Sequence, residues 1–246
     1  MTSAAAAPAL KEILNAERFR HVAKEAAAVY PRFASAAFLA HALPGLDDLT
    51  LMQRLRRMTE SLHGALPADY KKATSILRQL APRIDHGFVT LVLPDYVGRY
   101  GQEDFDTSME ALKFFTAFGS SEFAVREFLR REPARTLAVM KTWSLDSSEH
   151  VRRLASEGSR PRLPWSFRLD ALMADPNLAA RGILQKSQHG ALGETIIIGS
   201  HIRLDGAIPD LPRPSPLLGE HTDEVLQELG LTEDEVGMLY VEEILA

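Results

Sequence analysis

Arginine residues are concentrated in one short stretch of this 246-residue chain. Five of them lie within 17 residues: Arg152, Arg153, Arg160, Arg162 and Arg168. The same stretch holds a single acidic residue, Glu157, and a tryptophan, Trp165. Guanidinium groups match phosphate oxygens, and an indole stacks on a base or faces a cationic ring. These residue types predict a polyanion-binding groove. Taken alone, they leave an alternative open: a solvated helix face followed by a loop, with Trp165 packed in the core.

The net charge of −5 combines two unlike segments. Residues 1–200 carry 26 basic and 22 acidic residues, a net charge of +4, whereas residues 201–246 carry 2 basic and 11 acidic residues, a net charge of −9. A whole-chain average that disfavours nucleic acid therefore does not describe the basic segment. No apolar run approaches the roughly 20 residues that cross a bilayer, so no membrane association is expected. The first residues lack a Leu-rich signal core, which predicts a cytoplasmic protein.

Several kinds of catalytic site are excluded by composition. The chain has no cysteine, so it forms no disulfide, thiolate zinc site or thiol nucleophile. Its eight histidines are scattered, and none is paired at helical spacing. The glycine-rich phosphate loops, the Gly-x-Ser-x-Gly elbow and the His-Glu-x-x-His motif are all absent. We therefore expect no metal ion held by the protein.

The elements that position the arginines and the tryptophan are predicted to be helices. Apolar residues recur at steps of three and four in much of the first 185 residues, as in Ile13, Ala16, Phe19, Val22 and Ala26. Thr107 and Glu110 predict a capping box that begins a helix over 109–118. Pro164 predicts the start of a helix to about residue 174, and Pro176 the start of another towards residue 184.

Short helices that end at Pro or Ser every 10–14 residues are typical of stacked antiparallel pairs. The segment Asp146–Ala155 has the Asp…Val-Arg…Ala pattern that is common in the second helix of HEAT-type repeats. We predict a mainly α fold, a HEAT-like α-solenoid whose concave surface is free for a ligand. An irregular helical bundle is the alternative.

The composition changes sharply near residue 190. Thr195–Ile198 favours a strand, a proline-rich stretch follows, and two acidic helices are expected at about 222–229 and from Thr232, where Glu235 completes a capping box. The predicted domains are a helical-repeat domain over 1–186 and an acidic tail over 187–246. The apolar side chains of the two tail helices need a partner, which leaves self-association through them open.

Three motifs carry a family resemblance. They are Tyr100-Gly-Gln-Glu-Asp-Phe-Asp-Thr-Ser-Met109, Ser121-Glu-Phe-Ala-Val-Arg126 and Glu149-His-Val-Arg-Arg-Leu-Ala-Ser-Glu-Gly-Ser-Arg-Pro-Arg-Leu-Pro-Trp165. On these motifs, the stretch from Leu10 to about Leu184 resembles the bacterial AlkC-type DNA alkylation repair proteins, a HEAT-like glycosylase group. The resemblance implies excision of cationic N3-alkylated bases from duplex DNA, with no metal or organic cofactor.

The resemblance also implies roles for single residues. It places catalytic roles on Glu122, Glu157 and Trp165, and it places the five arginines of the stretch on the DNA backbone. Each glutamate has a simpler interpretation. Glu122 lies near a helix start, where the helix dipole favours a carboxylate, and Glu157 has the i, i+4 spacing of an ion pair with Arg153.

The sequence departs from this family after Pro176. The family continues with another repeat, whose helix carries a further catalytic aspartate, and simple spacing places Leu204 at that position. From Leu192 the chain instead resembles the C-terminal end of class III (CaiB/BaiF) CoA-transferases, without their catalytic body. The sequence thus leaves three functions to compare: a glycosylase, a non-catalytic DNA-binding scaffold and a CoA-transferase-related protein.

Overall fold

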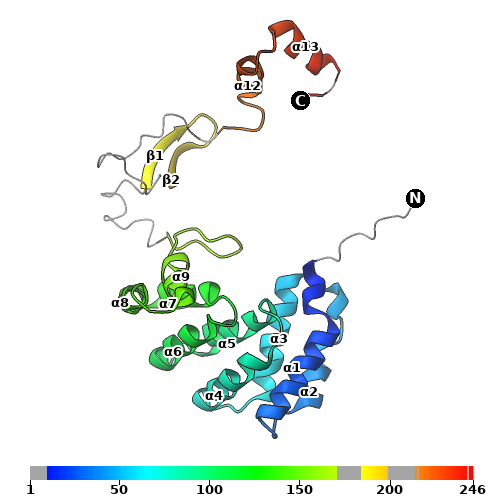
Figure 1. Ribbon diagram of the computed structural model, residues 1–246, viewed down its shortest axis with the longest axis vertical. Helices are drawn as coiled ribbons and strands as arrows, with labels where there is room; N and C mark the ends of the chain where they lie inside the picture. Colours follow the sequence, from blue (N-terminus) through cyan, green and yellow to red (C-terminus); the bar gives the residue numbers. More distant parts are fainter. Residues whose placement is uncertain (1–9, 171–183, 199–213, 215, 243, 246) are drawn as a thin grey trace, which may run out of the picture. The chain divides into compact units, whose positions relative to one another are not determined.

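A computed structural model describes residues 10–170, 184–198, 214, 216–242, 244 and 245 (Figure 1). The chain divides into two compact units, Met1–Asp170 and Ala171–Ala246. The domain boundary expected after residue 186 falls within a strand, β1 (Leu184–His189), and stays a prediction. The helix expected from Pro176 and the position of Leu204 lie outside the described residues.

The described part of the first unit, up to residue 158, consists of helices and short connections. Its α-helices are α1 (Ala16–Val29), α2 (Ser35–Ala42), α3 (Leu51–Ala65), α4 (Tyr70–Leu80), α5 (Val92–Tyr100), α6 (Phe105–Phe115), α7 (Glu122–Arg131), α8 (Pro133–Trp143) and α9 (Glu149–Gly158). Short 3-10 helices span Leu10–Leu14, Leu46–Asp48, Ala81–Arg83 and Val89–Leu91.

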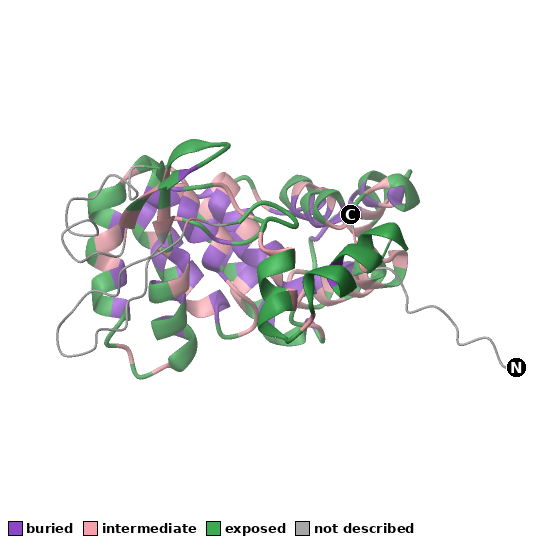
Figure 2. Cartoon of the chain, turned by 90° about the horizontal axis from the view of Figure 1, so that it is seen from above, coloured by how far each residue is buried: buried purple, intermediate pink, exposed green. Residues whose placement is uncertain are grey.

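These helices stack as pairs in two layers (Figure 1). Helices α3, α5, α7 and α9 contact one another in succession and form one layer, while α1, α4 and α6 form the other, with α8 packed on α7 and α9. Buried residues gather where the helices face one another (Figure 2). Leu77, Val97, Leu112 and Phe128 are among the side chains that fill this core. Each contributes about 1.5–3 kcal/mol by leaving water. The HEAT-like solenoid predicted from the sequence is confirmed.

The start of α6 differs from the prediction. The helix begins at Phe105 rather than Met109, and the side chain of Asp104 accepts a hydrogen bond from the Thr107 amide at 3.3 Å. The expected capping box of Thr107 and Glu110 is therefore wrong. Phe105 is buried against Phe128, and this contact favours a helix that already begins at Phe105.

Replacing Asp104 by alanine is expected to lower the free energy of unfolding by about 1 kcal/mol, because the Thr107 amide loses its acceptor. Burial alone raises the pKa of Asp104, but hydrogen bonds from Thr107 and the charge of Lys71 outweigh it and lower the pKa. The carboxylate therefore stabilises the fold above its unfolded pKa, and this contribution disappears as the pH falls through the folded pKa. Urea unfolding at neutral and at acid pH measures the effect. A difference between wild type and variant that is equal at both pH values would contradict it.

The segment that follows α9 is not the helix expected from Pro164. Residues 161–169 form turns and extended chain, and Trp165 has a φ of 64°. Left-handed backbone costs about 1–2 kcal/mol in a residue other than glycine, and it cannot continue a right-handed helix. The carbonyl oxygens of Pro161 and Phe167 accept hydrogen bonds from the Arg126 side chain instead of from a following helical turn. We call residues 159–169 the Trp165 loop.

The second unit holds an antiparallel hairpin and two helices. Strand β1 pairs with β2 (Gly193–Ile198), with Leu184 opposite Ile198 and His189 opposite Gly193. The predicted strand over Thr195–Ile198 is thus confirmed. Helices α12 (Thr222–Glu228) and α13 (Glu233–Val241) contact each other, and Thr232 and Glu235 form the expected capping box. Several apolar side chains of this helix pair are exposed, and self-association through them stays a prediction: Val225, Leu229, Met238, Val241 and, beyond α13, Ile244.

Within the described part of the chain, no helix combines the length and the apolar character needed to cross a membrane.

Candidate nucleic-acid interface

Glu122 is the first residue of α7, a helix of the inner layer α3–α5–α7–α9. Its side chain is only 12 % exposed, and its Oε1 lies 3.2 Å from Nε of Arg153 on the neighbouring helix α9. The helix start is held in place by two serines. Ser121 Oγ donates to the Leu112 carbonyl at 2.9 Å, and Ser120 Oγ accepts from the Glu122 amide at 3.2 Å. The shielded carboxylate of Glu122 is thus fixed beside the guanidinium of Arg153, whose side chain is 69 % exposed.

A small hollow of about 200 Å³ opens beside this ion pair. Its walls are Glu122, Arg153, His150 and the turn over residues 116–120. Gly119 packs so tightly in that turn that an added Cβ would lie 2.3 Å from Thr90 Oγ1. The hollow is therefore built on a tightly packed turn, and the Glu122–Arg153 ion pair forms part of its wall.

Glu157 does not form the ion pair expected with Arg153. Its Oε2 accepts from Nη1 of Arg160 at 2.8 Å, because Arg153 turns across to Glu122 on α7. The Glu157 side chain is about one-third exposed. The structure therefore joins Glu122 to Arg153, and it places Glu157 with its own partner at the end of α9.

The remaining arginines of the sequence cluster are exposed and differ in how firmly they are held. Arg152 donates from Nη1 to the carbonyls of Asp146 and Ser147, both at 2.8 Å. These bonds join its side chain to the segment just before its own helix, α9. Arg168 pairs with Asp170 at 2.8 Å. Arg162 makes no hydrogen bond or ion pair within the described residues. Arg162 can therefore turn towards an external anion at little cost, whereas Arg168 must first exchange its Asp170 partner.

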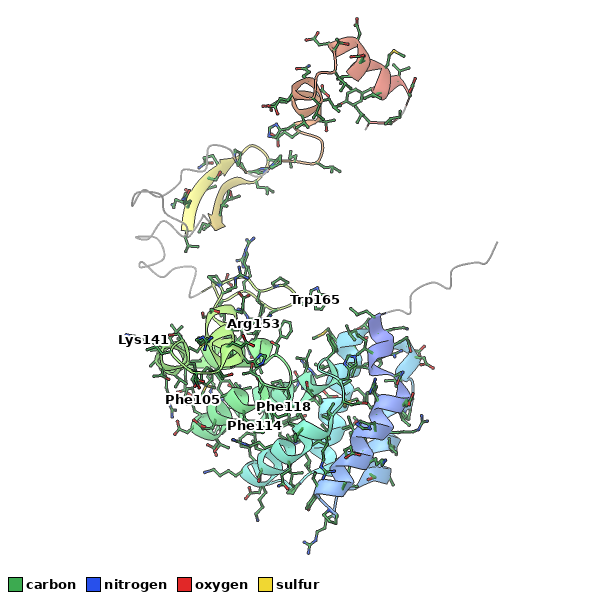
Figure 3. All side chains as sticks on the ribbon, viewed as in Figure 1. Phe105, Phe114, Phe118, Lys141, Arg153 and Trp165 are labelled. Atoms are coloured by element: carbon green, nitrogen blue, oxygen red, sulfur yellow. The ribbon has the colours of Figure 1, made fainter. Side chains whose placement is uncertain are left out.

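Trp165 lies at the outer end of its loop, beyond Arg153 (Figure 3). It is 71 % exposed, so the alternative of a core tryptophan is wrong. Trp165, Ser166 and Phe167 line a cleft of about 780 Å³ whose other walls come from α3, α5, α7 and the connections between them. Its charged wall residues are Arg56, Asp95, Arg99, Glu127, Arg130 and Arg131. Burial raises the pKa of Asp95 in this wall above its ordinary value. Trp165 is the exposed edge of a cleft that runs along the inner layer.

Arg126 is a residue of this site that the sequence interpretation assigned no role. It is fully buried, and its two terminal nitrogens donate to the carbonyls of Gly158, Arg160, Pro161 and Phe167. The signal that was available is its position in an amphipathic helix, flanked by the buried Val125 and Phe128. A charged residue within an apolar stripe is buried only with strong partners.

Among the described residues, no three histidine, aspartate or glutamate side chains lie close enough together to hold a metal ion.

The fold and the site together define a helical-repeat protein whose inner layer carries paired carboxylates and arginines below an exposed tryptophan. This is the class to which the AlkC-type repair proteins belong, and the resemblance seen in the sequence is confirmed. The chain is similar to a solved structure of Pseudomonas fluorescens alkylpurine DNA glycosylase AlkC, bound to DNA that contains an abasic site analog. That match has 60 % identity and a TM-score of 0.68, and it covers 71 % of this chain and 49 % of the other.

Curated relatives match the two parts of the chain separately. The Bacillus subtilis protein YhaZ is 44 % identical over 169 residues, which are 68 % of this chain and 47 % of YhaZ. The chain thus spans about half the length of YhaZ and of the AlkC chain. Formyl-CoA:oxalate CoA-transferase of Rhodopseudomonas palustris is 39 % identical over 70 residues, 28 % of this chain and 16 % of that enzyme. This partial match agrees with the resemblance of the tail. No family model matches the chain.

Proposed function

We propose that this chain repairs alkylated DNA by releasing cationic N3-alkylated bases from duplex DNA. The observation that carries the proposal is Glu122, a shielded carboxylate at the start of an inner-layer helix, fixed 3.2 Å from Arg153. The similarity to AlkC over 71 % of the chain supports it.

The chemistry needs little more than a fixed negative charge. In an N3-alkylated purine the base already carries a positive charge, so the bond between C1′ and the ring nitrogen breaks with both electrons moving to the base. The base leaves neutral, and the sugar becomes an oxocarbenium-like cation. A water oxygen then bonds to C1′, and its proton passes to a carboxylate or to solvent. Preorganised carboxylates stabilise the sugar cation most where water is excluded, which describes Glu122.

Glu157 and Trp165 complete the proposed site. In this proposal Glu157 provides a second negative charge once DNA phosphates compete for Arg160. Trp165 places an aromatic face against the damaged cationic base, a contact worth about 0.5–2 kcal/mol. The five arginines of the cluster contact the phosphate backbone, where guanidinium forks bind in a bidentate manner.

Base release from N-methylated duplex DNA tests this function. The full chain is incubated with the methylated duplex, and free base is separated and quantified against a Glu157→Gln variant prepared in the same way. The proposal expects release by the wild type well above the variant. Release equal to that of the variant would overturn the catalytic claim.

A second candidate, a DNA-binding scaffold without catalysis, is favoured by one observation. Residues 184–198 form the β1–β2 hairpin in the part of the chain where the family is expected to continue towards its aspartate-bearing helix. Such a scaffold binds DNA in a strongly salt-dependent manner and does not prefer damaged over intact duplex. CoA transfer is not proposed, because the similarity covers 16 % of the R. palustris enzyme.

Replacing Arg160, Arg162 and Arg168 together by glutamine is expected to weaken DNA binding and flatten its salt dependence. Each phosphate contact contributes about 0.9 to the slope of log K against log salt, so the slope should fall by about 2 to 3. Fluorescence anisotropy titrations of a labelled duplex at several salt concentrations measure this slope.

The matched control for this titration changes the same net charge elsewhere. Arg20, Lys24 and Arg32 are exposed residues on α1 and just after it, and their triple glutamine variant should keep the wild-type slope. An equal loss of slope in both triple variants would show that overall charge, rather than the cluster, determines binding.

A further inference from the structure

The Trp165 loop makes few hydrogen bonds of its own. Its Leu163 and Leu169 side chains are buried, whereas Trp165 at its tip is exposed and has left-handed backbone. Within the loop, the Ser166 amide donates to Leu163 at 3.1 Å and the Leu169 amide to Pro161 at 3.0 Å. Two internal hydrogen bonds are few for a segment that must hold a strained, exposed tryptophan.

Arg126 supplies the hydrogen bonds that join the loop to α7. Its Nη1 donates to the Gly158 carbonyl at 3.3 Å and to the Arg160 carbonyl at 2.5 Å, and its Nη2 donates to Pro161 at 3.2 Å and to Phe167. These four carbonyls lie on both sides of Trp165. One rigid, planar guanidinium therefore ties the two arms of the loop together.

The aromatic ring of Phe167 strengthens the same attachment. The guanidinium carbon of Arg126 lies 5.4 Å from the ring centroid, and that of Arg130, one turn further along α7, lies 5.0 Å from it. Phe167 lines the cleft next to Trp165. The arm of the loop that enters the cleft is thus held between two cations of α7.

We propose that Arg126 is a positioning residue, which acts through the Trp165 loop and holds the indole at the edge of the cleft. Arg126 is buried and touches no substrate. Its effect on base release rests on the proposed function, whereas its effect on the loop does not. Helix α7, which begins with the carboxylate Glu122, would then also set the position of the Trp165 indole through Arg126, four residues after Glu122.

Variants of Arg126 test the proposal in two backgrounds. The chain has two tryptophans, and Trp143 is buried in α8, so Trp143→Phe leaves Trp165 as the single tryptophan, which is excited selectively at wavelengths that tyrosine does not absorb. In that background, Arg126→Met should lower the fluorescence anisotropy of Trp165 and increase its quenching by acrylamide. In the wild-type background, Arg126→Met should lower single-turnover base release on the order of 100-fold, because a misplaced contact group costs about that much. Affinity for the same duplex should change far less, because the phosphate contacts remain.

Arg126→Lys and Arg54→Met separate positioning from stability. A lysine keeps the charge and the buried aliphatic chain but presents a compact ammonium that cannot bridge both arms of the loop. Arg126→Lys should therefore restore neither the wild-type anisotropy of Trp165 nor the wild-type rate of base release. Arg54 is equally buried and donates to the carbonyls of Leu49, Lys11 and Leu14, far from the loop in sequence. Arg54→Met should lower thermal stability, yet leave Trp165 anisotropy and the release rate per folded molecule unchanged.

Three outcomes would overturn the proposal. They are wild-type anisotropy in Arg126→Met, full rescue by Arg126→Lys, and an equal loss of Trp165 order in Arg54→Met. If Arg126→Met does not fold, Arg126→Lys against Arg54→Met provides the same comparison. If the wild type releases no base, the proposed function fails, and the anisotropy comparison still decides the role of Arg126.

Discussion

Replacing Glu122 by glutamine is expected to slow base release by about 100- to 1,000-fold, because the sugar cation loses its shielded counter-charge. Glutamine keeps the size of the side chain and one acceptor oxygen, so the loss reports the charge. Single-turnover release from methylated duplex, measured at saturating protein, gives the rate constant directly. DNA binding by this variant should remain, because Arg153, released from its ion pair, stays available to phosphate.

The control for this variant is Glu149→Gln. Glu149 is the first residue of α9, as Glu122 is of α7, so both carboxylates experience the same helix dipole. Glu149 is exposed, and it lines neither the hollow beside Glu122 nor the cleft beside Trp165. Its variant should lose at most a few tenths of a kcal/mol in stability and keep the wild-type release rate. A similar loss of rate in both variants would show that Glu122 acts through the helix start alone.

Replacing Phe128 by alanine is expected to lower the free energy of unfolding by about 3–5 kcal/mol, the range for a buried phenylalanine that leaves a cavity. Phe128 is almost completely buried in α7, and its ring meets that of Phe105 edge-on at 6.0 Å. Phe128 lies on the same helix as Glu122 and Arg126. Because whole domains are stable by only about 5–15 kcal/mol, the variant should lie close to the unfolding limit.

Urea unfolding followed by tryptophan fluorescence measures this loss, since both tryptophans lie in the first unit. Phe128→Leu is the matched control, and it should cost less than about 1.5 kcal/mol because it keeps an apolar side chain of similar size. Equal stability of the two variants would mean that the core around α7 closes over the cavity.

Local patterns predicted the helices well where the signals lie close together in the chain. The apolar spacing of Phe19, Val22 and Ala26 identified α1, and Thr232 with Glu235 identified the start of α13. Patterns were wrong at the start of α6 and after α9. Asp104, directly before α6, replaced the expected cap of that helix. In the segment after α9, the bonds from the distant Arg126 together with the left-handed Trp165 replaced the helix expected from Pro164.

By itself, the sequence determined the class of the protein: residue type and spacing predicted the helical-repeat fold and the arginine cluster, and the family resemblance of three motifs pointed to the two glutamates and the tryptophan. Only the tertiary structure decided which charges meet. Arg153 on α9 forms an ion pair with Glu122 on α7, and Glu157 forms one with Arg160. Arg126 is buried under the Trp165 loop and donates hydrogen bonds to it. The physical reason is that partners on one helix are fixed by spacing, whereas partners on α7 and α9 depend on how those helices pack. The packing of α7 against α9 also brings the buried Arg126 to four carbonyls that no local pattern connects to it.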